Sequence, residues 1–135
     1  VTAAAIIWVP QRAATNVSTP AGAERWSAAA VARQVAQGRP AFVYFTADWC
    51  LTCKANEVAA IDRKGVRRAF RDAKVEVFVG DWTTGDPAIT RFLESRGRAG
   101  VPLYLWYRPG AQPEELPQVL TQAMLISRAR RDRPR

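Results

Sequence analysis

The chain has 135 residues, a mass of 15.0 kDa and a formal net charge of +8 at pH 7. Its length suits one domain with a single core, and 48% hydrophobic and 24% charged residues are typical of a globular protein. Two cysteines and no histidine exclude Ser-His-Asp or Cys-His catalysis, an imidazole metal site and a four-cysteine zinc site built by this chain alone. Carboxylate chemistry, redox chemistry of the cysteine pair and pure binding remain.

The positive charge gathers toward the two ends of the chain. Residues 41–127 carry a net charge of +1, whereas residues 1–40 carry +3 and residues 128–135 carry +4. The predicted core is therefore nearly neutral, and we expect no nucleic-acid partner. One basic cluster lies within the core, and the sequence leaves open whether it is a solvated helix face or a docking patch for an acidic partner: Arg63, Lys64, Arg67, Arg68, Arg71 and Lys74.

The N-terminal segment divides into an apolar stub and a linker. Residues 1–9 are apolar and uncharged, but a span of a bilayer needs about 20 such residues, so this stretch cannot cross one alone. The sequence leaves open whether it is a first strand or the end of a membrane helix. Residues 10–24 have the composition of turns and linkers. We expect a stub and linker over residues 1–23, one domain over 24–127 and an Arg-rich tail over 128–135.

Within the domain, caps and hydrophobic runs predict alternating helices and strands. Ser27, Asp62, Asp86 and Thr121 are candidate N-caps. The expected helices, in chain order, cover residues 27–37, 50–61, 62–73 and 86–96, with a closing helix after residue 121. The expected strands cover residues 41–46, 75–79, 103–107 and 116–120, and the first of these is apolar throughout, which is typical of burial on both faces. Strands separated by helices imply parallel pairing, and the last two strands form an antiparallel hairpin.

The two cysteines lie where a buried strand passes into a helix. In the first turn of that helix, Cys50 faces unpaired backbone N–H groups and the positive end of the helix dipole, and both favour its thiolate. Cys50 is therefore the candidate nucleophile. Cys53, three residues further on, lies deeper in the helix and is the candidate resolving thiol. The alternatives are half of a zinc site or a pair of structural thiols.

Three segments together resemble a known family. They are residues 45–57 (FTADWCLTCKANE), 80–83 (GDWT) and 100–103 (GVPL). The general pattern resembles the thioredoxin superfamily, and these segments resemble the C-terminal periplasmic domain of the DsbD/ScsB thiol:disulfide interchange proteins, over roughly residues 24–127. The resemblance implies an α/β thioredoxin fold, with a central mixed sheet of four to five strands flanked by helices on both faces.

The resemblance also implies an activity and a cellular setting. In that family the domain takes electrons from an upstream membrane dithiol and passes them to disulfide-bearing periplasmic proteins. It implies a monomeric domain tethered to the bacterial inner membrane, and no metal, flavin or nucleotide. Two other functions remain open: a thioredoxin-fold binding module with idle cysteines, and a free-standing cytosolic thioredoxin.

Residues around the pair have candidate supporting roles. By the same resemblance, Pro102 is expected to be a cis-proline beside the cysteines, which leaves the backbone of Val101 free to pair with an extended substrate; the alternative is a trans proline that opens a strand. Trp49 and Asp48 flank the nucleophile, with Trp49 as a partly exposed lid or, alternatively, as part of the core. Lys54 is placed to favour the thiolate by its charge, although an exposed charge contributes little.

Proton transfer is expected to fall on a carboxylate. Glu57 lies four residues after Cys53, so the two share a helix face, and the family has a glutamate at the matching place. The alternative is an ordinary solvated glutamate. Many members also carry a buried acid six residues before the first cysteine, where this chain has Tyr44. That departure shifts more of the expected proton handling to Glu57.

Overall fold

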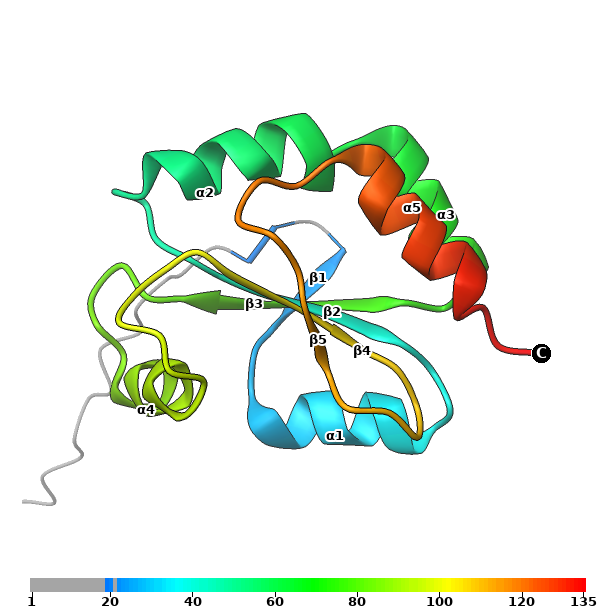
Figure 1. Ribbon diagram of the computed structural model, residues 1–135, viewed down its shortest axis with the longest axis horizontal. Helices are drawn as coiled ribbons and strands as arrows, with labels where there is room; N and C mark the ends of the chain where they lie inside the picture. Colours follow the sequence, from blue (N-terminus) through cyan, green and yellow to red (C-terminus); the bar gives the residue numbers. More distant parts are fainter. Residues whose placement is uncertain (1–18, 21) are drawn as a thin grey trace, which may run out of the picture.

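The computed structural model describes residues 19–20 and 22–135, which form a five-stranded sheet with helices on both faces (Figure 1). The strands are β1 (Ala23–Arg25), β2 (Ala41–Thr46), β3 (Glu76–Asp81), β4 (Leu103–Tyr107) and β5 (Glu114–Glu115). The helices are α1 (Ala28–Ala36), α2 (Leu51–Asn56), the π-helical turn η1 (Glu57–Ile61), α3 (Lys64–Asp72), α4 (Pro87–Ser95) and α5 (Gln122–Arg131). The interpretations of residues 1–18 as an apolar stub and most of a linker lie outside the described residues.

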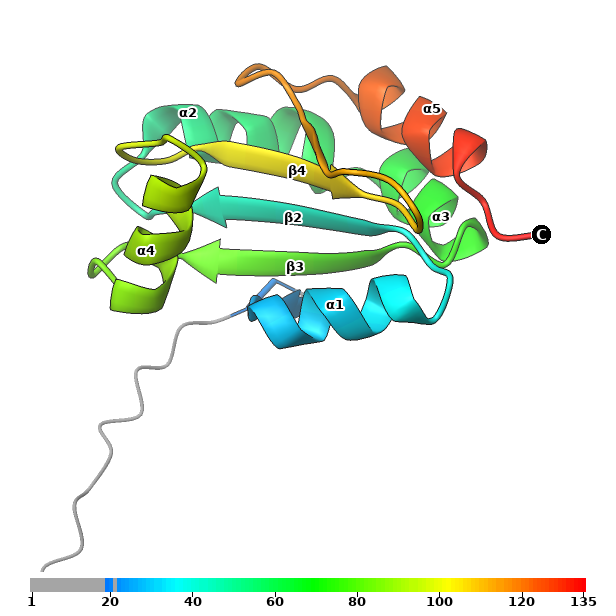
Figure 2. The same ribbon diagram turned by 60° about the horizontal axis from the view of Figure 1, so that its bottom comes forward.

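The sheet is mixed, with the strand order β1-β3-β2-β4-β5. β1, β3 and β2 are parallel, whereas β4 runs antiparallel to β2, and β5 antiparallel to β4. The expectation that helix-separated strands pair in parallel is therefore wrong for β4. Figure 2 shows the reason: α4 stays at the end of the sheet where β3 stops, so the chain enters β4 from that end and runs back.

The core consists of two layers, one on each face of the sheet. Phe42 and Tyr44 point toward α3, α5 and η1, while Val43 and Phe45 point toward the layer of α1 and α4. All six residues of β2 are buried, which confirms the prediction from its continuous apolar run. Figure 1 shows the same layers, with α2, α3 and α5 above the sheet and α1 below it.

Several predicted caps are confirmed. The Ser27 hydroxyl accepts a hydrogen bond from the backbone N–H of Ala30 at 3.1 Å, and the Asp86 carboxylate accepts one from Ala88 at 2.8 Å. Thr121 caps α5 in the same way. Asp62 is not a cap of α3, because its own N–H bonds to the carbonyl of Glu57 and thereby ends η1; Arg63 takes the N-cap position instead.

Three element boundaries differ from those that the sequence predicts. A short strand, β1, begins at Ala23, within what the sequence suggested was linker. The last strand is β5 at Glu114–Glu115 rather than residues 116–120, since Pro117 has no N–H with which to continue the ladder. Helix α5 continues to Arg131, four residues into the predicted tail, because Ala129 is fully buried. Within the described residues, every helix is too short or too polar to cross a bilayer.

Candidate active site

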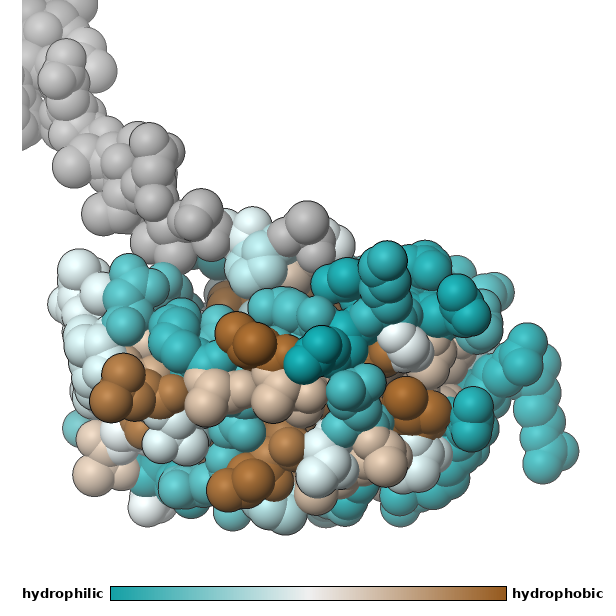
Figure 3. Space-filling view, turned by 90° about the horizontal axis from the view of Figure 1, so that it is seen from above, coloured by the Kyte–Doolittle hydropathy of each residue, from teal (hydrophilic) through white to brown (hydrophobic). Residues whose placement is uncertain are grey.

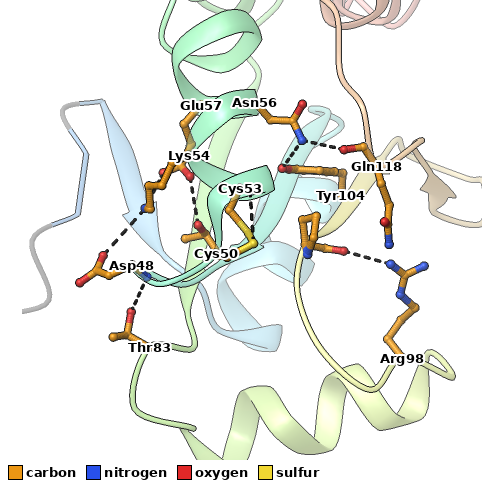
Figure 4. The surroundings of a disulfide bond; sticks show 12 residues. Asp48, Cys50, Cys53, Lys54, Asn56, Glu57, Thr83, Arg98, Tyr104 and Gln118 are labelled. Atoms are coloured by element: carbon orange, nitrogen blue, oxygen red, sulfur yellow. Dashed lines mark hydrogen bonds and ion pairs between the residues drawn. A yellow bond between two sulfur atoms is a disulfide. The ribbon is translucent and has the colours of Figure 1, made fainter.

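The cysteine pair lies at the junction of β2 and α2. Cys50 is the N-cap of α2, and its sulfur accepts a hydrogen bond from the backbone N–H of Cys53 at 3.2 Å. The two side chains form a disulfide, with their Cα atoms 5.2 Å apart (Figure 4). The same backbone N–H would stabilise a Cys50 thiolate after reduction, as the helix N-terminus predicts.

Solvent exposure distinguishes the two sulfurs. Cys50 is 8% exposed and Cys53 only 1% exposed. Cys50 is therefore the sulfur more accessible to an incoming disulfide. The assignment of Cys50 as nucleophile and Cys53 as resolving thiol stays a prediction.

A loop before β4 lies against the disulfide. The peptide bond between Val101 and Pro102 is cis, the geometry that the family resemblance implies. Val101 packs against the buried cluster of Ala47, Cys50 and Cys53. The Arg98 guanidinium donates a hydrogen bond to the carbonyl of Pro102 at 3.0 Å and thereby ties this loop to the end of α4 (Figure 4).

On the other side of the pair, Trp49 is held in place although it is 58% exposed. Its indole N–H donates to the carbonyl of Thr83 at 3.2 Å, and the backbone N–H of Asp48 donates to the Thr83 hydroxyl at 3.0 Å. Thr83 is in turn oriented by the carboxylate of Asp81. The backbone of Asp48 and the ring of Trp49 are thus fixed, while the Asp48 carboxylate is largely exposed and lies near the Lys54 ammonium.

The Glu57 carboxylate lies one turn beyond the cysteines and is mostly buried. Its side chain is 12% exposed; it accepts a hydrogen bond from the Thr46 hydroxyl at 3.0 Å and pairs with the Lys54 ammonium at 3.3 Å. These three residues line a cavity of about 630 Å³. Among the hydrogen bonds of the described residues, none joins Glu57 to either sulfur. Lys54 also lies 3.8 Å from Asp48, so its charge is shared between two carboxylates.

Tyr44 stands where many members of the family carry a buried acid. Its phenol does not take over the proton-transfer chemistry of that acid. It is 1% exposed, and burial raises its pKa, with further increases from the nearby Glu57 and Asp62 carboxylates. Burial also raises the pKa of Tyr104 to about 12, although a hydrogen bond from Asn56 lowers it. Both phenols therefore stay neutral at physiological pH. Neither can accept a proton from Cys53.

Asn56 is a structural residue of the site that the sequence analysis did not single out. Its amide is 5% exposed and donates to the Tyr104 hydroxyl at 2.9 Å and to the Gln118 carbonyl at 2.7 Å (Figure 4). It also accepts from the Leu120 N–H at 3.0 Å. The side chain thus joins α2 to β4 and to the segment before α5.

The sequence analysis did not single out Arg98 and Thr83 either. Their partners are distant in sequence or are backbone carbonyls, so the local sequence gave no signal for them. Asn56 did offer one, because it is a polar residue on an otherwise apolar helix face.

Two tryptophans near the sheet differ in burial. Trp106 is fully buried in the core, whereas Trp82 is only partly buried and donates to the Thr90 hydroxyl at 2.8 Å. The described part of the chain brings no three His, Cys, Asp or Glu side chains together in a way that could hold a metal ion.

Comparison with known proteins agrees with this geometry. A thioredoxin-like family model matches residues 22–109, and a search of curated proteins found no match. Among solved structures, the oxidised DsbD C-terminal domain of Neisseria meningitidis is 22% identical with a TM-score of 0.62, covering 82% of this chain and 100% of that one. The reduced form is 23% identical with a TM-score of 0.60, covering 78% and 89%.

A thioredoxin from Thermus thermophilus is similar to the same degree, at 21% identity and a TM-score of 0.61, covering 82% of this chain and 86% of that one. At these identities the likeness concerns the fold. The family model spans β1 to β4 and includes the cysteine pair and the cis-proline. The chain therefore belongs to the thioredoxin-like family and is a thiol-disulfide oxidoreductase.

Proposed function

We propose that this domain works as a reductase, passing electrons from an upstream membrane dithiol to disulfide-bearing proteins in the bacterial periplasm. The observation that carries the thiol-disulfide exchange chemistry is the pair itself: Cys50 caps a helix and is the more exposed sulfur, with the cis-Pro102 loop beside it. The DsbD-like setting is supported by the FTADWCLTCKANE segment and by the similarity in fold to the DsbD C-terminal domain.

The reaction has two exchange steps. The Cys50 thiolate attacks one sulfur of a substrate disulfide, forms a mixed disulfide and releases the other substrate sulfur as a thiolate, which takes up a proton. Cys53 then loses its proton and attacks the Cys50 sulfur, which closes the Cys50–Cys53 disulfide and releases the second substrate thiolate. Two electrons pass from the protein to the substrate. We assign the Cys53 proton to Glu57, which lies one turn further along the same helical segment.

Substitutions of the cysteines test the mechanism. The pre-reduced protein is mixed with insulin, and disulfide reduction is followed by thiol titration. Cys50→Ser is expected to abolish reduction, and Cys53→Ser to form a mixed disulfide that is not resolved. Thr52→Ser, which lies between the cysteines, serves as the control. Undiminished reduction by Cys50→Ser would contradict the mechanism.

The reduction potential tests the direction of electron flow. Equilibration with glutathione is expected to place the pair well below about −120 mV, the value of a strong oxidant. A potential near that value would mean that the domain oxidises its partners.

Location is tested in intact cells that express the full-length protein. After reduction, Cys50 is expected to react with a maleimide that cannot cross the inner membrane. Labelling only after the inner membrane is permeabilised would favour the second candidate, a cytosolic thioredoxin. The fold of this chain is as similar to the Thermus thermophilus thioredoxin as to the DsbD domain, which supports that candidate to the same degree.

A further inference from the structure

A basic surface lies at the end of the molecule away from the disulfide. Helices α3 and α5 lie side by side there (Figures 1 and 2), and this end is mainly hydrophilic in the view from above (Figure 3). We define the basic face as eight exposed residues: Arg63, Lys64, Arg67, Arg68, Arg71, Lys74, Arg130 and Arg133. None of the seven ion pairs between described residues includes a member of this face.

Several charges of α3 work against the stability of their own helix, although Arg71 in its last turn is favoured by the helix dipole. Its first turn holds no acidic residue, so Lys64 and Arg67 lie near the positive end of the helix dipole. Lys64 and Arg68 are four residues apart, as are Arg67 and Arg71, and like charges at that spacing repel. A helix face that is only solvated gains more from alternating Glu and Lys. The pattern of α3 instead points to a negative charge outside the chain.

Three of these arginines converge on a groove between the two helices. Arg68, Arg130 and Arg133 line a hollow of about 260 Å³, together with Asp72. The remaining lining side chains are small apart from Ile126. Guanidinium groups bind phosphate oxygens in pairs of parallel hydrogen bonds. The groove, with three cations and one anion, suits a phosphate group.

We propose that the basic face docks on an anionic phospholipid surface, with a headgroup phosphate in the groove between α3 and α5. A specific protein partner would require apolar or aromatic anchors at the centre of the interface. The exposed large apolar residues, Trp49, Leu51, Val58 and Val119, all lie outside the basic face. The basic face lies near the start of β2, whereas Cys50 follows its end, so docking in this way leaves Cys50 directed away from the bilayer. The proposal does not depend on the chemistry of the dithiol.

Binding to vesicles tests the proposal. The oxidised protein is sedimented with vesicles of equal parts phosphatidylglycerol and phosphatidylcholine, or of phosphatidylcholine alone. We expect binding to the first only, and its loss as salt is raised, because screening weakens each contact. The triple variant Arg68→Gln, Arg130→Gln and Arg133→Gln should weaken binding on the order of 100-fold, at about fivefold for each charge removed near the surface.

A matched variant separates this face from net charge. Arg33, Arg39 and Arg91 are exposed, unpaired among the described residues and outside the basic face. Changing these three to Gln lowers the net charge equally and should leave vesicle binding within about fivefold of the parent, since at most one contact is affected. Equal losses in the two variants, or no binding to phosphatidylglycerol at low salt, would overturn the proposal. Thermal unfolding of both variants verifies that each is folded.

Discussion

The amide of Asn56 offers the sharpest test of how the site is held together. Asn56→Ala removes three hydrogen bonds of 2.7 to 3.0 Å and leaves the N–H of Leu120 without its partner in a buried position. A neutral hydrogen bond contributes about 1 kcal/mol net, and an orphaned buried donor costs about 1–3 kcal/mol. Because these contributions overlap, we expect the free energy of unfolding to fall by about 3 kcal/mol. For a chain of this size the melting temperature should fall by about 10 °C.

The measurement is urea unfolding of the oxidised protein, followed by tryptophan fluorescence. Asn56→Asp should be destabilised to a similar degree, because it keeps an acceptor for Leu120 but loses the donors to Tyr104 and Gln118. Gln122→Ala is the matched control, since its exposed amide makes one bond of 3.4 Å to Ala59 in the same region; it should change stability by less than about 0.5 kcal/mol. If Asn56→Ala loses no more stability than Gln122→Ala, the reasoning fails.

Three further predictions concern titratable groups. Glu57→Gln should slow resolution by Cys53 on the order of 100-fold and change its pH profile; an unchanged profile in single-turnover kinetics would remove Glu57 from proton transfer. Tyr44→Phe should leave that profile unchanged and raise the free energy of unfolding in urea by about 1 kcal/mol, because the buried hydroxyl has no partner among the described residues; a large loss would reveal a partner. The hydrogen bond from Arg128 lowers the pKa of Glu114 below 4.5, so this pair stabilises the fold above about pH 4.5 and is lost as pH falls. Glu114→Gln should flatten the decline in melting temperature between about pH 5 and 3; an unaltered decline would rule out this linkage.

The elements that the sequence predicted well are those specified by neighbouring residues. The bounds of β2 and β4 follow from uninterrupted apolar runs, and the starts of α1, α4 and α5 follow from caps whose partners lie two or three residues away. The last predicted strand was misplaced for a reason that is also local, since Pro117 has no N–H to contribute to the ladder.

The candidate site divides in the same way. Cys50 and Cys53 were found because their chemistry depends on position in one helical turn. The hydrogen bonds of Asn56 join residues 48 to 64 positions apart, and nothing in the local pattern specified those partners. The family resemblance, rather than the residues alone, placed Pro102 beside the cysteines.

The sequence by itself thus determined that this chain carries a dithiol at a strand-to-helix junction, with a nearly neutral core and positive charge toward its ends. Only the tertiary structure decided that β4 runs antiparallel, that Tyr44 is a buried neutral phenol and that α3 and α5 combine their arginines around one groove. The physical reason is the range of the interactions: caps, turns and helix-dipole effects act within one or two turns of chain. Strand pairing, desolvation and the convergence of charge depend on segments that meet only after folding.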